Sequence, residues 1–373
     1  MLNFEIEKRV GLARVGKIIT PHGEIHTPAF VGAATRATVK ALTFSEMRDL
    51  GSEAILANTY HLFLTPTADL IERAGGLAKF SGWNAPTFTD SGGFQIFSLP
   101  DVKISEQGAN FKSHLNGDEF LMTPELSMET QWKIGADIHM AFDQLAKSEN
   151  YADMESAMNR THRWLDRCLE KHHELKSLAE KNHEPDQFLY AVVQGGTFLD
   201  LREKSAKYTA EKPVDGFGIG GVFTADGMDE MLKVVNSILP EEKPRHLLGM
   251  GQEPRDLFIG AEFGCDTFDC VGPTRLARNG ALYTLNGRIN IKNSKFKEDF
   301  SPVDDSCSCE LCQNYSRSYL HHLFRTDEIT GKVLASIHNE FFVVDTVKKI
   351  RAALLDGTFE DYKTDFLSRY YQK

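Results

Sequence analysis

Short apolar runs alternate with longer segments of helical periodicity along most of the chain. Such alternation is typical of parallel β/α units. The helical segments have clear ends: Thr43 and Glu46 form a capping-box pair, and Thr123 precedes Pro124 in a helix that Gly135 ends. Eight runs are candidate strands: Pro28–Val31, Glu53–Ala57, Pro86–Thr89, Asp137–Phe142, Phe188–Val193, Gly216–Gly220, Arg245–Leu248 and Asp266–Phe268. This number predicts an α/β fold of the (β/α)₈ TIM-barrel type.

Two regions depart from the alternation and predict additions to the barrel. Residues Ser98–Leu121 are polar with alternating stretches, which indicates an inserted hairpin. Residues 284–338 carry clustered cysteines and indicate a small zinc-binding subdomain. The predicted organisation is therefore a catalytic barrel of residues 1–283 and 339–373, with the zinc-binding subdomain at 284–338.

Polar residues or glycines directly follow most of the predicted strands. They are Asn58, Asp90, Asp143, Gln194, Gly221, Gly249 and Asp269. In a TIM barrel the carboxyl ends of all strands meet at one mouth, where active sites lie. Any one of these residues could instead cap a helix or form a turn, but their convergence favours a site.

Asp90 and Asp269 are the candidate catalytic pair. Two carboxylates on one pocket suit displacement at an anomeric carbon, where one attacks and the other manages the proton of the leaving group. Both follow apolar strands, which desolvates them and helps to separate their pKa values. A double displacement retains configuration and needs the two groups about 5 Å apart. A barrel glycosidase would satisfy the same requirements.

The other residues of the mouth favour a purine over a sugar. Asp143 can accept hydrogen bonds from the ring N–H and exocyclic amine of a guanine-like base, while Gln194 and the Gly221 N–H can donate to its carbonyl. Phe94 can stack on the ring face, as aromatic side chains do with splayed-out bases.

Composition and charge add a candidate nucleic-acid contact. The net charge of −11 argues mildly against a polyanionic partner. However, Thr274–Lys297 contains no acidic residue, and its basic residues are Arg275, Arg278, Arg288, Lys292, Lys295 and Lys297. On charge alone a solvated surface is the simpler explanation. The N-terminus lacks signal-peptide features and no apolar run could span a bilayer, which predicts a cytoplasmic protein without a membrane partner.

Three cysteines and a distant histidine form a candidate metal site. Cys307, Cys309 and Cys312 are closely spaced, and His338 supplies a fourth ligand. Three thiolates and one imidazole make a closed tetrahedral set, so one structural Zn²⁺ per chain is expected. His321 and His322 are rival fourth ligands, but they lie on a predicted helix and His338 is preferred.

Several segments of the chain resemble the tRNA-guanine transglycosylase (queuine tRNA-ribosyltransferase) family of bacterial type. The resemblance rests on Phe88–Gln95, Gln194–Gly196, Ile219–Gly221, Phe268–Gly280, Tyr319–Leu323 and the cysteine spacing, and covers nearly the whole chain. It implies a pentosyltransferase that exchanges guanine at the wobble position of tRNA for a 7-deazaguanine in queuosine modification. No nucleotide cofactor is implied.

The resemblance also implies a role for each site residue. Asp269 would be the nucleophile that forms a covalent ribosyl intermediate, and Asp90 the general acid/base. The implied base-binding residues are Ser91, Gly92, Gly93, Phe94, Asp143, Gln194, Gly221 and Leu248. The implied tRNA-binding residues are Gly249, Met250, Gly251, Gln252, Arg255, Asp256, Thr274, Arg275, Leu276, Ala277 and Arg278. The basic stretch would meet phosphates, and the zinc subdomain would support the tRNA side and a homodimer contact.

Departures from the family pattern surround the base pocket. Leu145 replaces a usual cysteine, and Val222, Phe223 and Thr224 replace a usual Leu-Ala-Val. The incoming base is therefore either 7-aminomethyl-7-deazaguanine or queuine. Two other hypotheses are a non-catalytic tRNA-binding subunit, which should lack the carboxylates, and a barrel glycosidase, which the zinc site and basic stretch disfavour.

Overall fold

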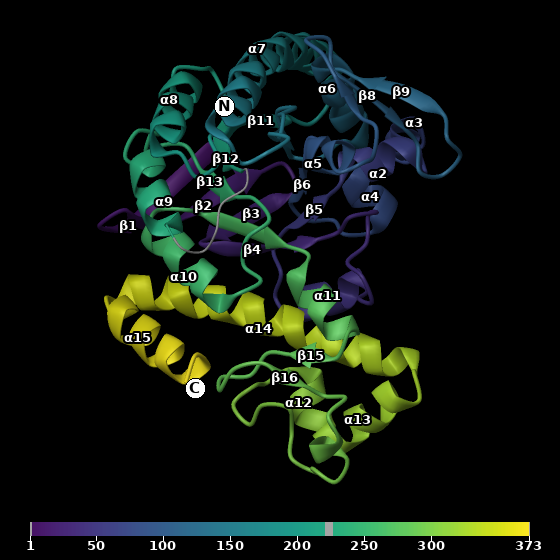
Figure 1. Cartoon of the computed structure of the whole chain (residues 1–373), viewed down its shortest axis with the longest axis vertical. Coiled ribbons are helices and arrows are strands. Elements are labelled where there is room, and N and C mark those ends of the chain that lie inside the picture. The colour runs from purple at the N-terminus through teal and green to yellow at the C-terminus, as the bar shows by residue number, and fades with distance from the viewer. Residues whose placement is uncertain (1, 221–226, 373) are drawn as a thin grey trace.

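Eight parallel strands close into a barrel in the computed structural model, which describes residues 2–220 and 227–372 (Figure 1). In barrel order they are β10 (Ile138–Met140), β11 (Phe188–Val193), β12 (Gly216–Ile219), β13 (Arg245–Leu247), β14 (Thr267–Cys270), β4 (Ala29–Ala33), β5 (Ile55–Ala57) and β6 (Thr87–Thr89). Every predicted strand overlaps one of these. The predicted TIM-barrel fold is confirmed.

Helices surround the barrel and follow its strands along the chain. They are α1 (Phe44–Asp49), α2 (Thr59–Leu64), α3 (Ala68–Arg73), α4 (Leu77–Ser81), α5 (Gly93–Phe97), α6 (Pro124–Ile134), α7 (Tyr151–Asn182), α8 (Leu199–Ala210), α9 (Met228–Asn236), α10 (Pro254–Glu262) and α11 (Gly272–Arg278). Thr43 and Glu46 form the expected reciprocal capping box of α1. Thr123 caps α6, and Gly135 ends it at φ +70°.

A three-stranded antiparallel sheet covers the amino-terminal end of the barrel. It consists of β1 (Asn3–Val10), β2 (Ala13–Thr20) and β3 (Gly23–Thr27). Its residues bond to aspartates that directly precede barrel strands: Arg14 pairs through two nitrogens with Asp266, and His22 Nδ1 lies 2.8 Å from Asp137. Ile18 and Ile25 join the apolar core inside the barrel. Because one end is closed, the carboxyl-terminal mouth is the end left for a site.

The region predicted as an inserted hairpin is a three-stranded sheet, so that expectation is corrected. Strands β7 (Lys103–Ile104), β8 (Ala109–Lys112) and β9 (Glu119–Met122) pair antiparallel in sequence order. The additional strand is the short β7, which pairs with β8 across a turn at 105–108. The sheet lies between α5 and α6 in the chain and beside α7 in Figure 1.

The cysteine region forms a small unit beside the barrel. It contains β15 (Ala281–Leu282), β16 (Ile289–Asn290), η1 (Ser294–Phe296), α12 (Glu310–Asn314) and α13 (Arg317–Arg325), with a core of its own. Helix α14 (Ile329–Asp356) lies between this unit and the barrel, and α15 (Phe359–Tyr370) follows it (Figure 1). The proposed boundary at 338 therefore falls inside one continuous helix. None of the helices within 2–220 and 227–372 is long and apolar enough to cross a membrane.

Candidate active site

Asp90 directly follows β6 and is held by the amino-terminal turn of α2. Its Oδ1 accepts hydrogen bonds from the backbone N–H groups of Thr59 and Gly92, both at 3.0 Å, and its Oδ2 accepts one from Asn58 Nδ2. Burial raises the pKa of Asp90 to about 7, against the lowering effect of these donors, and the charge of Asp269 adds to the rise. A carboxyl group with this pKa exchanges protons readily near neutral pH.

Asp269 lies in β14, and its hydrogen bonds are to a single oxygen. Its Oδ1 accepts a hydrogen bond from the Gly249 N–H at 2.8 Å and lies 3.1 Å from His246 Nε2. Because an ionised carboxylate only accepts hydrogen bonds, a neutral His246 carries its proton on Nε2 and donates it to Asp269. Asp90 and Asp269 both lie at the carboxyl ends of barrel strands and therefore at the same mouth, although β4 and β5 separate their strands.

His246 is a site residue that the sequence analysis missed. Its side chain is fully buried inside the barrel, where it stacks on Phe88 with ring centroids 5.4 Å apart. Its Nδ1 lies 2.8 Å from the Thr267 hydroxyl, which can donate to it. These contacts fix the ring, so His246 presents one nitrogen to Asp269. The only sequence signal was a titratable residue inside a short predicted strand, next to Arg245.

Asp143 follows β10 and is the centre of a second polar group. Its Oδ1 accepts a hydrogen bond from Ser91 Oγ at 2.8 Å, and its Oδ2 accepts one from Gln194 Nε2 at 2.6 Å. Burial raises the pKa of Asp143, and these two hydrogen bonds oppose the rise. The structure thus brings together three of the predicted base-binding residues, from the ends of β6, β10 and β11.

Glycines let this polar group form. Gly92 has φ +78°, and a Cβ at Gly93 would lie 2.7 Å from the Asp143 carbonyl oxygen. The turn after Asp90 therefore packs directly on the backbone of Asp143. Gly93 begins α5, on which Phe94 is 65% exposed and free to act as a stacking platform.

Leu248 directly follows β13. Its side chain packs against β12 and the residue after it, where a Cβ at Gly218 or Gly220 would approach Leu248 Cδ1 to 3.1 and 3.2 Å. Leu145, which follows the polar group, is partly exposed. The predicted Gly221 and the departures Val222, Phe223 and Thr224 lie outside the described residues.

The residues predicted to bind tRNA divide by exposure. On α11, Arg275 is exposed and Leu276 and Arg278 are partly exposed, whereas Thr274 and Ala277 are buried. In the loop before α10, Gly249 and Gln252 are exposed, Met250 is partly exposed and Gly251 is buried. Arg255 is exposed and lies 4.7 Å from the centre of the Tyr371 ring, while the buried Asp256 caps α10. The exposed members can reach a ligand, and the buried ones support the backbone.

The four predicted metal ligands form one cluster. The Sγ atoms of Cys307, Cys309 and Cys312 lie 3.8, 3.3 and 3.3 Å from His338 Nδ1, and all four atoms lie within 4.8 Å of one another. His338 Nε2 donates to the Tyr283 carbonyl at 2.7 Å, which turns Nδ1 toward the sulfurs. A tetrahedral zinc site has sulfur-to-nitrogen edges of about 3.5 Å. The cluster therefore could bind a metal ion. The rival His321 instead bonds to the Ile291 carbonyl at 2.7 Å.

A family model described as queuine tRNA-ribosyltransferase matches residues 9–372. The chain belongs to this family. Similar proteins carry the same name. One from Herpetosiphon aurantiacus is 46% identical over 372 residues, covering 98% of this chain and 92% of its own length. Another from Desulforamulus reducens is 43% identical, with coverages of 98% and 97%, and one from Streptococcus pyogenes is 45% identical, with 98% and 95%.

Membership in the queuine tRNA-ribosyltransferase family confirms the resemblance found in the sequence. It also confirms the predicted enzyme class, since the family transfers a pentosyl group. Asp90 and Asp269, the predicted catalytic pair, both lie at the mouth of the barrel.

Proposed function

We propose that this enzyme replaces a guanine in tRNA with a 7-deazaguanine by a double displacement at the ribose C1′. The observation that carries the proposal is the contrast between the two carboxylates of the mouth. Oδ1 of Asp269 accepts hydrogen bonds from the Gly249 N–H and from His246, whereas burial raises the pKa of Asp90 to about 7. One group suits nucleophilic attack and the other suits proton transfer.

Each half-reaction uses both carboxylates. Because Oδ1 of Asp269 is engaged by two donors, its Oδ2 attacks C1′, the bond from C1′ to N9 of guanine breaks, and Asp90 protonates the departing base. In the second half, the ionised Asp90 removes a proton from the incoming base. That base attacks C1′ and displaces Asp269, which restores the ribose configuration.

The polar group around Asp143 would hold the purine edge. Asp143 accepts from the ring N–H and the exocyclic amine, and Gln194 donates to the carbonyl through its second amide hydrogen. Ser91 and Gly221 complete the edge, with Phe94 and Leu248 on the two faces. Extruding the nucleotide costs roughly a few kcal/mol, and these hydrogen bonds and stacking contacts offset that cost.

The base-exchange assay tests this function. The enzyme is incubated with tRNA labelled in its wobble guanine and with either 7-aminomethyl-7-deazaguanine or queuine. Release of label with one of these bases supports the proposal and identifies the base. No release of label with either base would favour the hypothesis of a non-catalytic tRNA-binding subunit. Cleavage of free glycosides would favour a glycosidase.

The exposed arginines of α11 would bind the tRNA backbone beside the reacting ribose. Arg275→Ala should weaken tRNA binding and reduce the slope of log K against log salt by about 1, as loss of one phosphate contact does. Binding titrations at several salt concentrations measure this slope. Arg9→Ala is the control, because Arg9 lies in the sheet at the closed end of the barrel. Equal slopes for Arg275→Ala and the unmodified enzyme would contradict the assignment.

Zinc would cross-link the segment of Cys307, Cys309 and Cys312 to α14, which carries His338. It would in this way support the surface that binds tRNA. Next to His338, Asn339 donates to the backbone carbonyls of Pro273 and Ala281, both at 3.0 Å. The cluster is thus connected to α11, which follows the nucleophile. The unit that contains the cysteines would also supply the homodimer contact.

We also propose that the enzyme acts in the cytoplasm.

Loss of the metal should therefore affect both stability and tRNA binding. Metal analysis should give one zinc per chain, and Cys309→Ser should lose it. The melting temperature should fall by at least about 5 °C, because a structural zinc contributes directly to folding. The KM for tRNA should rise as well. An unmodified protein without zinc, or a variant with unchanged KM for tRNA, would contradict this role.

A further inference from the structure

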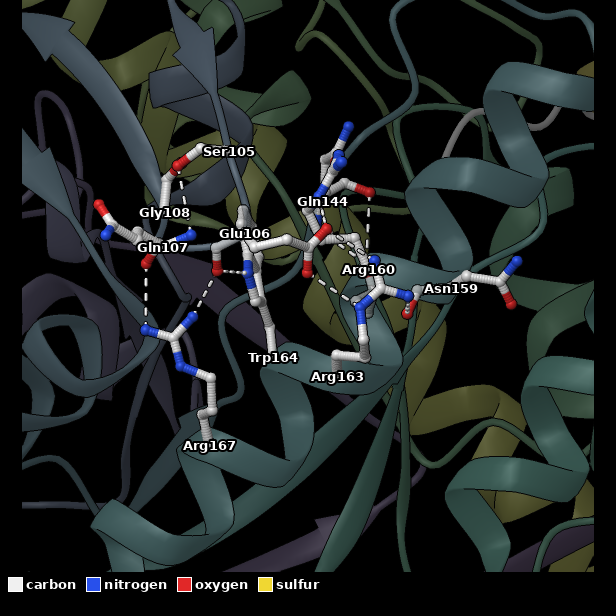
Figure 2. Close-up of polar contacts among 11 residues, drawn as sticks. Ser105, Glu106, Gln107, Gly108, Gln144, Asn159, Arg160, Arg163, Trp164 and Arg167 are labelled. Carbon is white, nitrogen blue, oxygen red and sulfur yellow. Dashed lines mark hydrogen bonds and ion pairs between the residues drawn. The ribbon is translucent and has the colours of Figure 1, made fainter.

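An acidic side chain of the inserted sheet, Glu106, contacts two arginines of α7 (Figure 2). Its carboxylate accepts from Arg163 at 2.9 and 2.7 Å and from Arg160 Nε at 2.8 Å. Arg163, with Arg160, holds the pKa of Glu106 at about 2 against the opposing effect of burial. The carboxylate is therefore charged at every pH at which the enzyme would work.

The backbone of the same turn is also bound to α7. The Glu106 carbonyl accepts from Trp164 Nε1 at 3.0 Å and from Arg167 at 2.6 Å, and Arg167 reaches the Gln107 carbonyl at 3.1 Å (Figure 2). The turn therefore remains attached to the helix through contacts that do not involve the carboxylate.

Arg160 differs from the other two arginines in having a partner next to the base pocket. Its Nη1 donates to Gln144 Oε1 at 2.6 Å, and Gln144 follows Asp143 in the chain (Figure 2). The backbone N–H of Gln144 donates to the Thr161 hydroxyl at 2.9 Å. Neighbouring residues of α7 thus hold both the side chain and the backbone of the buried Gln144.

The segment before and at Asp143 is also fixed by contacts with α5 and α7. The Asp143 carbonyl packs on Gly93 of α5, where a Cβ would approach it to 2.7 Å. Phe142 stacks on Trp164 of α7, with centroids 4.9 Å apart and planes at 18°. These contacts are apolar or steric and set the distances from the segment to α5 and α7. The hydrogen bond from Arg160 is directional and sets its orientation.

We infer that Arg160 is a positioning residue that aims Asp143 at the purine edge, with Glu106 orienting the guanidinium. The inference rests on the proposed role of Asp143 in base binding. Arg160 does not touch the base; it acts through Gln144 on the backbone that carries Asp143. Its loss should weaken capture of the free base and leave the bond chemistry at Asp90 and Asp269 unchanged.

Steady-state incorporation of labelled guanine into tRNA tests the inference. Arg160→Met should raise KM for guanine about three- to tenfold, the effect of losing one hydrogen bond, with kcat and KM for tRNA unchanged. Arg163→Met is the matched control, because it loses the same partner, Glu106, without a contact to Gln144. KM does not depend on the folded fraction, so partial unfolding does not obscure the result. Equal KM values for the two arginine variants would overturn the inference.

A double-mutant cycle separates positioning from a general structural effect. Gln144→Met should raise KM for guanine as Arg160→Met does, and the double variant should be no worse than either single variant. Gln144→Glu keeps an acceptor for Arg160 and should keep the low KM. Additive effects of Arg160→Met and Gln144→Met would contradict the inference.

Asp143→Asn distinguishes failure of the inference from failure of the proposed function. An unchanged KM for guanine in this variant would remove the role of Asp143, and the inference with it. A raised KM in Asp143→Asn combined with an unchanged KM in Arg160→Met would refute only the role of Arg160.

Discussion

Asp269→Asn is expected to abolish covalent capture of tRNA and to lower the exchange rate by at least about 10⁴-fold, as loss of a catalytic nucleophile does. The amide cannot attack C1′, but its oxygen can still accept from Gly249 and His246. The local structure should therefore survive. Capture is measured as a tRNA–protein band that resists denaturation when no incoming base is present.

Two measurements confirm that the Asp269→Asn variant is folded. Its melting temperature should remain close to that of the unmodified enzyme, and its non-covalent affinity for tRNA should be retained. Covalent capture by this variant at a rate near that of the unmodified enzyme would show that another residue is the nucleophile.

Guanine release in the first half-reaction should decline as the pH rises above about 7. The pKa of Asp90 is raised to this value, so its protonated form, which acts as the acid, is lost above it. On this alkaline limb of the pH profile, the rate of guanine release should fall tenfold for each pH unit. Asp90→Asn should remove the limb and slow release by about 10²- to 10⁴-fold. Single-turnover release of labelled guanine from tRNA measures both effects.

Asp143→Asn provides the control for this pH profile. It should weaken base binding but keep the alkaline limb, because it leaves Asp90 and its donors in place. An alkaline limb that persists in Asp90→Asn would assign the proton transfer to a different group.

The barrel and the position of the polar residues at its mouth could be predicted because their signals are local. Buried parallel strands are mostly apolar, so each of the eight left a recognisable run in the sequence. The barrel then places every residue that follows a strand at one mouth. This rule alone was sufficient to predict that Asp90, Asp143 and Gln194 lie together.

The sheet at the closed end of the barrel was missed because its pattern is different. Strand β1 is half polar, with charged residues such as Glu5, Glu7 and Arg9 exposed. The attachment of the whole sheet depends on aspartates that precede barrel strands and are distant in sequence. Arg14 of β2, for example, pairs with Asp266. Pairings of this kind cannot be read from a local window.

His246 and α11 show a related limit at the site itself. Both faces of a barrel strand are buried, so the sequence does not tell which side chains point inward, and His246 was passed over. Thr274 and Ala277 belong to a recognisable motif, but the fold buries them and leaves Arg275 exposed. Motifs indicate which segment forms the site, whereas burial decides which side chains can touch a ligand.

The site of covalent attachment tests the central claim most directly. The trapped complex would be digested with nuclease and protease, and the modified peptide sequenced by mass spectrometry. The account predicts a ribose-linked nucleotide on Asp269, within the segment Phe268–Arg275. Attachment at Asp90 or at any other residue would contradict it.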